Sequence, residues 1–238
     1  SALKNDAERR RRLVEERPSD SHTRWMTDSC MKWYELGTPP NYEPDPSNNL
    51  AARAERTGGN VWALALDALL AEDGKAFLLF PFENYSGGNL EVVREMLLDE
   101  HTICGLGDAG AHVATICDAS YPTFLITHWS RDRERGERLP LEHLVAKQTS
   151  KTARAYGLLD RGVLAPGYRA DFNVVDLNRL NLTRPELVYD LPAGGRRFIQ
   201  RATGYVHTFV SGQEVMHEGE HTGALPGRLV RGARPSPA

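Results

Sequence analysis

The sequence lacks several features that mark common protein classes. It holds three cysteines in 238 residues, Cys30, Cys104 and Cys117, and no CxxC pair. This count argues against a disulfide scaffold or a zinc ribbon and favours a reduced, cytoplasmic protein. No apolar run approaches the roughly 20 residues of a membrane span, and the first residues lack the apolar core of a signal peptide. We therefore expect neither a membrane partner nor secretion.

A strong charge of either sign is also missing. The formal net charge is −3, which gives no general attraction to nucleic acid or to anionic lipid. The only basic run, at residues 9–12, has glutamates three or four positions away, at Glu8, Glu15 and Glu16. This spacing is typical of a solvated helix with paired charges, so we expect no nucleic-acid partner.

The first part of the chain alternates helical and strand patterns. Helices are predicted at 51–56, after an asparagine cap, and at 60–74 and 89–99. AFLLFPF (76–82) and TICGLG (102–107) are apolar runs of strand length. Continuous apolar strands separated by helices predict a parallel sheet of βα units. Too few such units precede residue 108 to close a barrel, so the chain is interpreted as part of something larger.

In the second part of the chain, the sequence pattern changes from helices to short strands. Helices are predicted near 121–129 and at 141–156, the second closed by Gly157. From residue 161 short strands alternate with turn glycines, and a hairpin is predicted to turn at SGQ (211–213). The predicted divisions are 1–158 for the last βα units, 159–222 for a small β-domain and 223–238 for a loose C-terminal tail.

Asp108 is the principal candidate for chemistry. It stands in GLGDAG, directly after the predicted strand, where loops of parallel sheets converge on one face. Gly105, Gly107 and Gly110 would let the backbone approach a ligand. A carboxylate placed there can bind a metal or move a proton. From position alone, Asp108 could equally cap the helix that follows.

Three stretches carry a resemblance to a known family. They are GLGDAGAH (105–112), LPLEHLVAKQTSKTARAYGLLDRGVLAPGYRADFNVVD (139–176) and YVHTFVSGQEVMHEGEHTGALPGRLVRG (205–232). With these, the chain resembles the amidohydrolase superfamily and, within it, the D-aminoacylase group. The run RGVLAPGYRAD is widespread in the superfamily, whereas HTGALPGRLVRG is similar to the D-aminoacylase group in particular.

The resemblance implies an α/β fold: the C-terminal part of a (βα)8 TIM-type barrel followed by a small β-sandwich domain. It also implies one or two divalent metals, usually zinc, and Asp108 matches the aspartate after the last barrel strand. Asp108 would then be both metal ligand and catalytic residue, taking a proton from the attacking water and returning it to the departing nitrogen. The implied cofactor is Zn, with most of its ligands outside this chain.

The family pattern is incomplete here in two respects. No His-x-His occurs, and the eight histidines show no spacing that would build a metal cage alone. The chain by itself is therefore expected to be inactive and to need the N-terminal half of the same enzyme. Second, HVATICDASYPTF (112–124) lacks the arginine with which the D-aminoacylase group would hold a substrate carboxylate, and Asp118 there would repel one.

Three further residues are candidates for contact with substrate. His112 matches a histidine common at this position in the group, and it either lines the pocket or holds the loop by hydrogen bonds. Asn84 and Tyr85 follow the strand at 76–82 and would face the same mouth, although ordinary loop polarity explains them equally well.

The functional prediction is part of a metal-dependent amidohydrolase that hydrolyses a non-peptide C–N bond of a small-molecule amide. N-acyl-D-amino-acid deacylation is the reaction that the group implies. Two alternatives stay open: a non-catalytic binding or interaction module, and a deaminase or cyclic amidase of the same superfamily. An exposed half-barrel edge would also favour association into a homo-oligomer.

Overall fold

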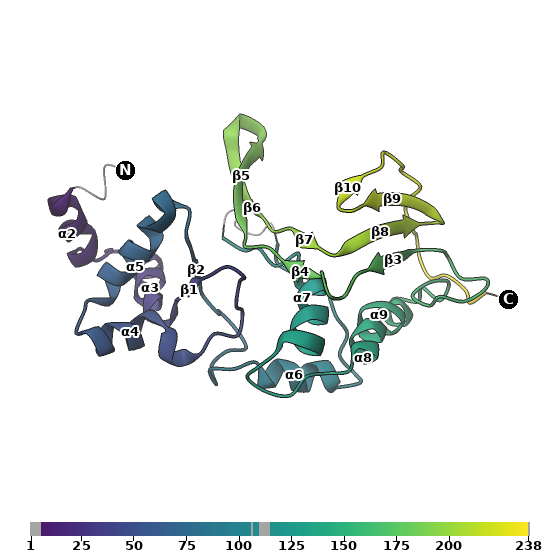
Figure 1. Cartoon of the computed structure of the whole chain (residues 1–238), viewed down its shortest axis with the longest axis horizontal. Coiled ribbons are helices and arrows are strands. Elements are labelled where there is room, and N and C mark those ends of the chain that lie inside the picture. Colours follow the sequence, from purple (N-terminus) through teal and green to yellow (C-terminus); the bar gives the residue numbers. More distant parts are fainter. Residues whose placement is uncertain (1–5, 106, 110–114, 238) are drawn as a thin grey trace. The chain divides into compact units, whose positions relative to one another are not determined.

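The computed structural model describes residues 6–105, 107–109 and 115–237. The chain divides into two compact units, Ser1–Val93 and Arg94–Ala238. Helices dominate the first unit, and the second holds helices followed by short strands (Figure 1). The mixed α/β class predicted from the sequence is thus confirmed.

Helices of the first unit begin where the sequence supplies a cap. The α-helices are α2 (Ala7–Glu15), α3 (Ser21–Asp28), α4 (Leu50–Thr57) and α5 (Val61–Leu70), and the 3₁₀ turns are Ser29–Lys32, Pro46–Asn48 and Ala71–Gly74. Asn49 accepts a hydrogen bond from the amide of Ala52, and Asn60 accepts two, from Trp62 and Ala63. An asparagine at this position satisfies helix amides that otherwise lack partners. Helix α3 was not predicted.

The arginine run at 9–12 lies on helix α2, as the charge pattern predicted. Arg11 bonds Glu8 at 2.8 Å and Glu15 at 2.6 Å, and Arg12 bonds Glu16 at 2.8 Å. These pairs lie one helical turn apart on an exposed helix. The run is therefore a solvated helix face whose charges are neutralised locally.

The apolar run at 76–82 forms only a short strand, and its pairing corrects the sequence prediction. Strand β2 (Phe77–Leu79) pairs with β1 (Tyr34–Leu36) in antiparallel register, Tyr34 opposite Leu79. Leu78 packs against the core made by Cys30, Leu50, Ala54, Val61 and Ala65. The sequence suggested that this apolar run is a strand covered on both faces by βα units. Its apolar character is explained instead by packing on helices α4 and α5.

The strand predicted at 102–107 is not formed within the described residues. The hydroxyl of Thr102 donates to the carbonyl of Met96, at the end of helix α6 (Glu91–Leu98). Each pair of named strands in the described ranges is antiparallel. The parallel sheet predicted from the sequence is thus absent from this part of the chain, and the barrel stays an expectation.

Helices of the second unit include a long segment that π-helical turns interrupt. The elements after α6 are α7 (Tyr121–Thr127), the π-turn His128–Asp132, α8 (Leu141–Ala146), the π-turn Lys147–Lys151 and α9 (Thr152–Ala155). The last three are contiguous and cover the predicted helix at 141–156. Gly157 ends it with φ of 69°, a left-handed conformation that glycine adopts without strain.

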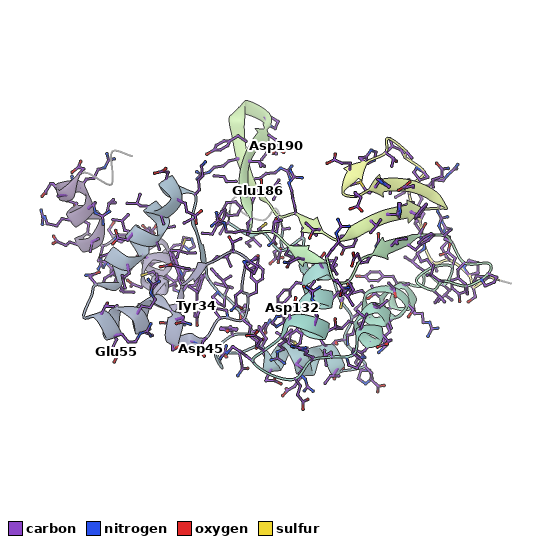
Figure 2. The ribbon with its side chains drawn as sticks, in the orientation of Figure 1. Tyr34, Asp45, Glu55, Asp132, Glu186 and Asp190 are labelled. Carbon is purple, nitrogen blue, oxygen red and sulfur yellow. The ribbon has the colours of Figure 1, made fainter. Side chains whose placement is uncertain are left out.

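Short antiparallel sheets follow. The strands are β3 (Phe172–Val175), β4 (Asn181–Leu182), β5 (Glu186–Leu191), β6 (Gly195–Ile199), β7 (Ala202–Thr203), β8 (Tyr205–Val210), β9 (Gln213–His217) and β10 (Glu220–His221). One sheet has the order β10-β9-β8-β3, while β4 pairs with β7 and β5 with β6. The predicted hairpin is confirmed: β8 and β9 are joined through Ser211 and Gly212, both at positive φ. Figure 2 labels Asp190 on β5, where it pairs with Arg197 of β6 at 2.6 Å.

Hydrogen bonds join the helices of the second unit to the segment that holds its strands. Trp129, Leu144 and Leu180 are fully buried. Thr123 of α7 and Tyr205 of β8 share a hydrogen bond of 2.8 Å, and Arg131 donates to the carbonyl of Leu180 at 2.8 Å. The strands are therefore anchored to the helices that precede them.

The C-terminal stretch, predicted to be a loose tail, is attached to the rest of the second unit at Arg234. The amide of Arg234 donates to the carbonyl of Gly157 at 2.7 Å, and the amide of Leu159 donates to Arg234 at 3.1 Å. Leu158 and Arg234 thus form a parallel bridge. Arg234 thus forms hydrogen bonds with main-chain groups just after helix α9. This pairing between distant residues cannot be predicted from the local sequence.

None of the helices in the described part of the chain combines the length and the apolar character needed to traverse a bilayer.

Candidate functional site

The loop after helix α6 presents Asp108 to solvent. Its backbone amide donates a hydrogen bond of 3.0 Å to Oδ2 of Asp118. Among the described residues, no partner of the Asp108 carboxylate itself is found. The Asp118 carboxylate therefore positions the backbone at residue 108, and no other described residue engages the exposed side chain of Asp108.

Position 107 needs a glycine for a steric reason that the sequence alone did not show. A Cβ at this position would lie 2.9 Å from the carbonyl oxygen of Asp118 and 3.0 Å from its Cγ. The first distance is shorter than real Cβ atoms show, and the second is tighter than nine in ten real Cβ contacts. Gly105 differs, because a Cβ there would meet nothing within 4 Å. Gly110 lies outside the described residues.

The Asp118 carboxylate is only partly satisfied. Its Oδ2 accepts from Asp108, whereas its Oδ1 is buried and has no hydrogen-bond partner among the described residues. A buried carboxylate oxygen without a partner costs free energy unless a proton donor or a cation supplies the missing interaction. The pair of carboxylates gives this loop a negative character that favours a cation over an anion.

Lys147 supports the segment that leads into the loop, and sequence reasoning missed it. Its Nζ donates to the carbonyl of Asp99 at 2.6 Å, to the hydroxyl of Thr102 at 2.7 Å and to the carbonyl of Met96 at 3.4 Å. The side chain is buried, and this loss of solvation lowers the pKa of Lys147. A signal was present, because Lys147 stands three residues after the buried Leu144 and so on the same helix face.

The two cysteines near the loop are not activated. Burial raises the pKa of the Cys104 thiol. Burial and the negative charge of Asp118 raise that of Cys117. Both therefore remain protonated at neutral pH and are poor nucleophiles.

Of the other predicted site residues, Asn84 and Tyr85 belong to the first unit, and His112 lies outside the described residues. His112 falls in the range 110–114, which is not described. Asn84 is exposed at φ of 59°, and Tyr85 is buried. The Tyr85 hydroxyl donates to the carbonyl of Pro44, and its ring meets Tyr34, labelled in Figure 2, edge-on at 6.4 Å. These contacts hold the first unit together, and a role of Asn84 or Tyr85 in substrate binding stays a prediction.

The residues around Asp108 fit one ligand of a metal centre and not a whole set. Zinc takes three or four protein donors, mostly histidine, cysteine and carboxylate. Within the described ranges, the cluster of three such donors that could hold an ion is His207, Glu214 and His217, on the β8–β9 hairpin. A centre at Asp108 would thus need ligands that this part of the chain does not supply.

Comparison with known proteins begins with a family model. The model described as amidohydrolase family matches residues 81–216, which is more than half of the chain. The matched range includes Asp108, Asp118 and Lys147.

Two curated relatives match over shorter stretches. An allantoinase from Deinococcus radiodurans is 38% identical over 98 residues, which are 39% of this chain and 20% of that protein. A D-aminoacylase from Alcaligenes xylosoxydans is 35% identical over 106 residues, 44% of this chain and 19% of that protein. The matched region spans about a fifth of either relative.

Among solved structures, a D-aminoacylase crystal structure said to define a novel subset of amidohydrolases is 22% identical to this chain. The match covers 81% of this chain and 36% of that one, with a TM-score of 0.41.

Proposed function

This chain belongs to the amidohydrolase family, and from that premise we propose that it forms the C-terminal portion of a metal-dependent hydrolase of non-peptide C–N bonds. The resemblance to the D-aminoacylase group, first read from GLGDAGAH and HTGALPGRLVRG, is confirmed by the matched relatives. The observation that carries the proposal is Asp108, an exposed carboxylate on a glycine loop inside the matched region. The remaining part of the site would come from the upstream part of the enzyme.

Asp108 acts as the catalytic carboxylate in this proposal. As a carboxylate, it accepts a proton from the attacking water and delivers it to the departing nitrogen, so that no charged amide anion leaves. Its backbone is held by Asp118, which keeps the carboxylate in place without occupying it. A divalent metal, when bound, polarises the scissile carbonyl and lowers the pKa of water.

Two substrate classes are candidates. The match to a D-aminoacylase supports an N-acyl-D-amino acid. The match to an allantoinase supports a cyclic amide, and a second observation favours this class. The loop sequence 112–124 contains no arginine or lysine to bind a substrate carboxylate, and Asp118 adds a negative charge beside Asp108. A neutral substrate suits this loop better than an anionic one.

The test uses the complete polypeptide that contains this chain, as wild type and as Asp108→Asn. We expect bound zinc and hydrolysis of either N-acyl-D-amino acids or cyclic amides. Asp108→Asn should lower kcat by about 10²–10⁴-fold, the usual contribution of a general acid–base group. Asp190→Asn, an exposed aspartate of the β5–β6 hairpin, is the matched control and should retain activity.

Unchanged turnover in Asp108→Asn would remove this residue from the mechanism. Absence of turnover and of metal from the wild-type polypeptide, together with a stable monodisperse 238-residue chain, would favour the non-catalytic module instead.

A further inference from the structure

We propose that the β8–β9 hairpin carries a divalent-cation site of the zinc class, formed by His207, Glu214 and His217. This site is independent of the proposed hydrolytic function. It lies on the four-stranded sheet at the end of the chain, where β8, β9 and β10 run side by side (Figure 1).

A β-bulge brings the three side chains onto one face. His207 and His217 are direct cross-strand partners, and Phe209 is opposite Glu214. Residues three apart in a regular strand, such as Glu214 and His217, would point to opposite faces. The register shift in this hairpin leaves Val215 as the extra residue, which restores Glu214 to the face of His217.

The donor atoms converge on one point. Nδ1 of His207 lies 2.6 Å from Oε1 of Glu214, and Nδ1 of His217 lies 2.9 Å from the same oxygen. The two Nδ1 atoms are 3.2 Å apart. Zinc bonds of about 2.0–2.2 Å at tetrahedral angles separate neighbouring donors by roughly 3.3–3.6 Å. The observed triangle is slightly tighter, and small side-chain rotations would open it around an ion.

Hydrogen bonds among the two Nδ1 atoms and Oε1 of Glu214 are geometrically unfavourable. For both histidines to donate to Glu214, each Nδ1 must carry a proton, and two N–H groups then crowd one oxygen only 3.2 Å from each other. A cation accepts a lone pair from all three atoms at once and removes this crowding. Coordination through Nδ1 leaves each Nε2 protonated and free to meet solvent or a second partner.

The surroundings suit an open three-ligand site. The side chain of His217 is 57% exposed, so an ion has access and a water molecule can take the fourth position. The His207 ring contacts Phe209, which stacks on Phe172 of β3 at 4.6 Å. On the β9 side, Thr222 donates its hydroxyl to the carbonyl of Glu214 at 2.7 Å and so holds the bulged strand in place.

The experiment is a calorimetric titration of Zn²⁺ into the metal-stripped 238-residue chain. We expect one saturable site per chain, weakened at least about tenfold in His207→Gln and in His217→Gln. His221→Gln is the matched control, because His221 pairs with Met216 and so lies on the opposite face of the same sheet. Its affinity should equal that of the wild type.

Asp108→Asn separates this site from the proposed catalytic one. Binding that survives in Asp108→Asn and disappears in His207→Gln belongs to the hairpin. Binding lost in Asp108→Asn alone would overturn the hairpin site while leaving the proposed hydrolase intact. Equal affinity in all the variants, or no saturable binding by the wild type, would also overturn it.

A measurement on the unmutated chain covers the case in which a variant fails to fold. Long-range ¹H–¹⁵N correlation spectra report the protonation and coordination of each histidine ring nitrogen. Addition of Zn²⁺ should shift Nδ1 of two histidines, with the signals of His221 unchanged. Spectra in which no Nδ1 responds to Zn²⁺ would contradict the proposal.

Discussion

The backbone amide of Asp108 is bound to the carboxylate of Asp118 at 3.0 Å, across ten residues of chain. The candidate catalytic residue is therefore positioned by a second carboxylate, and not by its own side chain. The close approach depends on Gly107, whose missing Cβ leaves room for Asp118. The geometry of this loop can thus be altered without touching either aspartate.

Gly107→Ala should displace Asp118 and lower the hydrolytic activity that we propose for the complete polypeptide. The added methyl group would lie 2.9 Å from the Asp118 carbonyl oxygen, and overpacking of this kind typically costs about 1–3 kcal/mol. Gly105→Ala is the matched control, since nothing lies within 4 Å of its Cβ. Urea denaturation and kcat of both variants provide the comparison. Equal behaviour of the two would show that Asp118 does not constrain the loop.

Lys147→Met should destabilise the second unit. It removes the donor to two main-chain carbonyls and to the Thr102 hydroxyl, three part-buried hydrogen bonds that typically contribute about 0.5–1.5 kcal/mol each. Lys151→Met changes an exposed lysine one turn further along the same helical segment and should have little effect. Denaturant midpoints of the two variants decide the matter. A stable Lys147→Met protein would mean that these carbonyls find water instead.

Cys30 should make the free energy of unfolding depend on pH in the alkaline range. Burial, helped by the negative charge of Asp28, raises the pKa of this thiol from 9.0 to about 11. Between these values the unfolded chain loses the proton and the folded chain keeps it, so the free energy of unfolding falls as pH rises from about 9 to 11. Below pH 9 both states keep the proton and the effect vanishes.

The measurement for Cys30 is urea denaturation from pH 8 to 11, with Cys30→Ala as the comparison. Lysines, tyrosines and the other two cysteines titrate in both proteins, so the difference between the two curves isolates Cys30. The variant should be less stable at pH 8 and should lose less stability above pH 9. Parallel curves would show that the thiol ionises normally in the folded state.

Asn60→Ala should lower the free energy of unfolding by about 1 kcal/mol, the usual effect of losing an N-cap. Asn60 accepts from the amides of Trp62 and Ala63, which have no other helix partner. Asn60→Asp keeps an acceptor at the same place and should restore most of the loss. Thermal melts of the three proteins test this, and a melt of Asn60→Asp as low as that of Asn60→Ala would contradict the capping role.

Local signals predicted several helices, although not α3. Asn49 and Asn60 mark helix starts, Gly157 marks an end, and the pattern around residues 211–213 predicted the hairpin. Each depends on interactions a few residues apart. Whether residues 76–82 or 102–107 form strands, and with which partners, depends on residues distant in sequence. The apolar content of a segment does not specify those partners.

The candidate site was predictable to the same extent. Asp108 was found because glycines on both sides of a lone aspartate are a local pattern. The contribution of Asp118 requires a loop to fold back on itself, and that of Lys147 requires the end of another helix nearby. The cluster of His207, Glu214 and His217 depends on a single β-bulge, and no residue in the sequence predicts that bulge.

The parallel bridge between Leu158 and Arg234 has a practical consequence for protein engineering. It closes the chain from the end of helix α9 through all the strands β3 to β10 into a loop tied by main-chain bonds. Pro237 also lies where a side chain on Gly167 would be. A fusion partner joined directly after these residues would begin on the surface of the second unit, so a linker of several residues is needed to keep it clear. Truncation before Arg234 would remove the two main-chain bonds that close this loop.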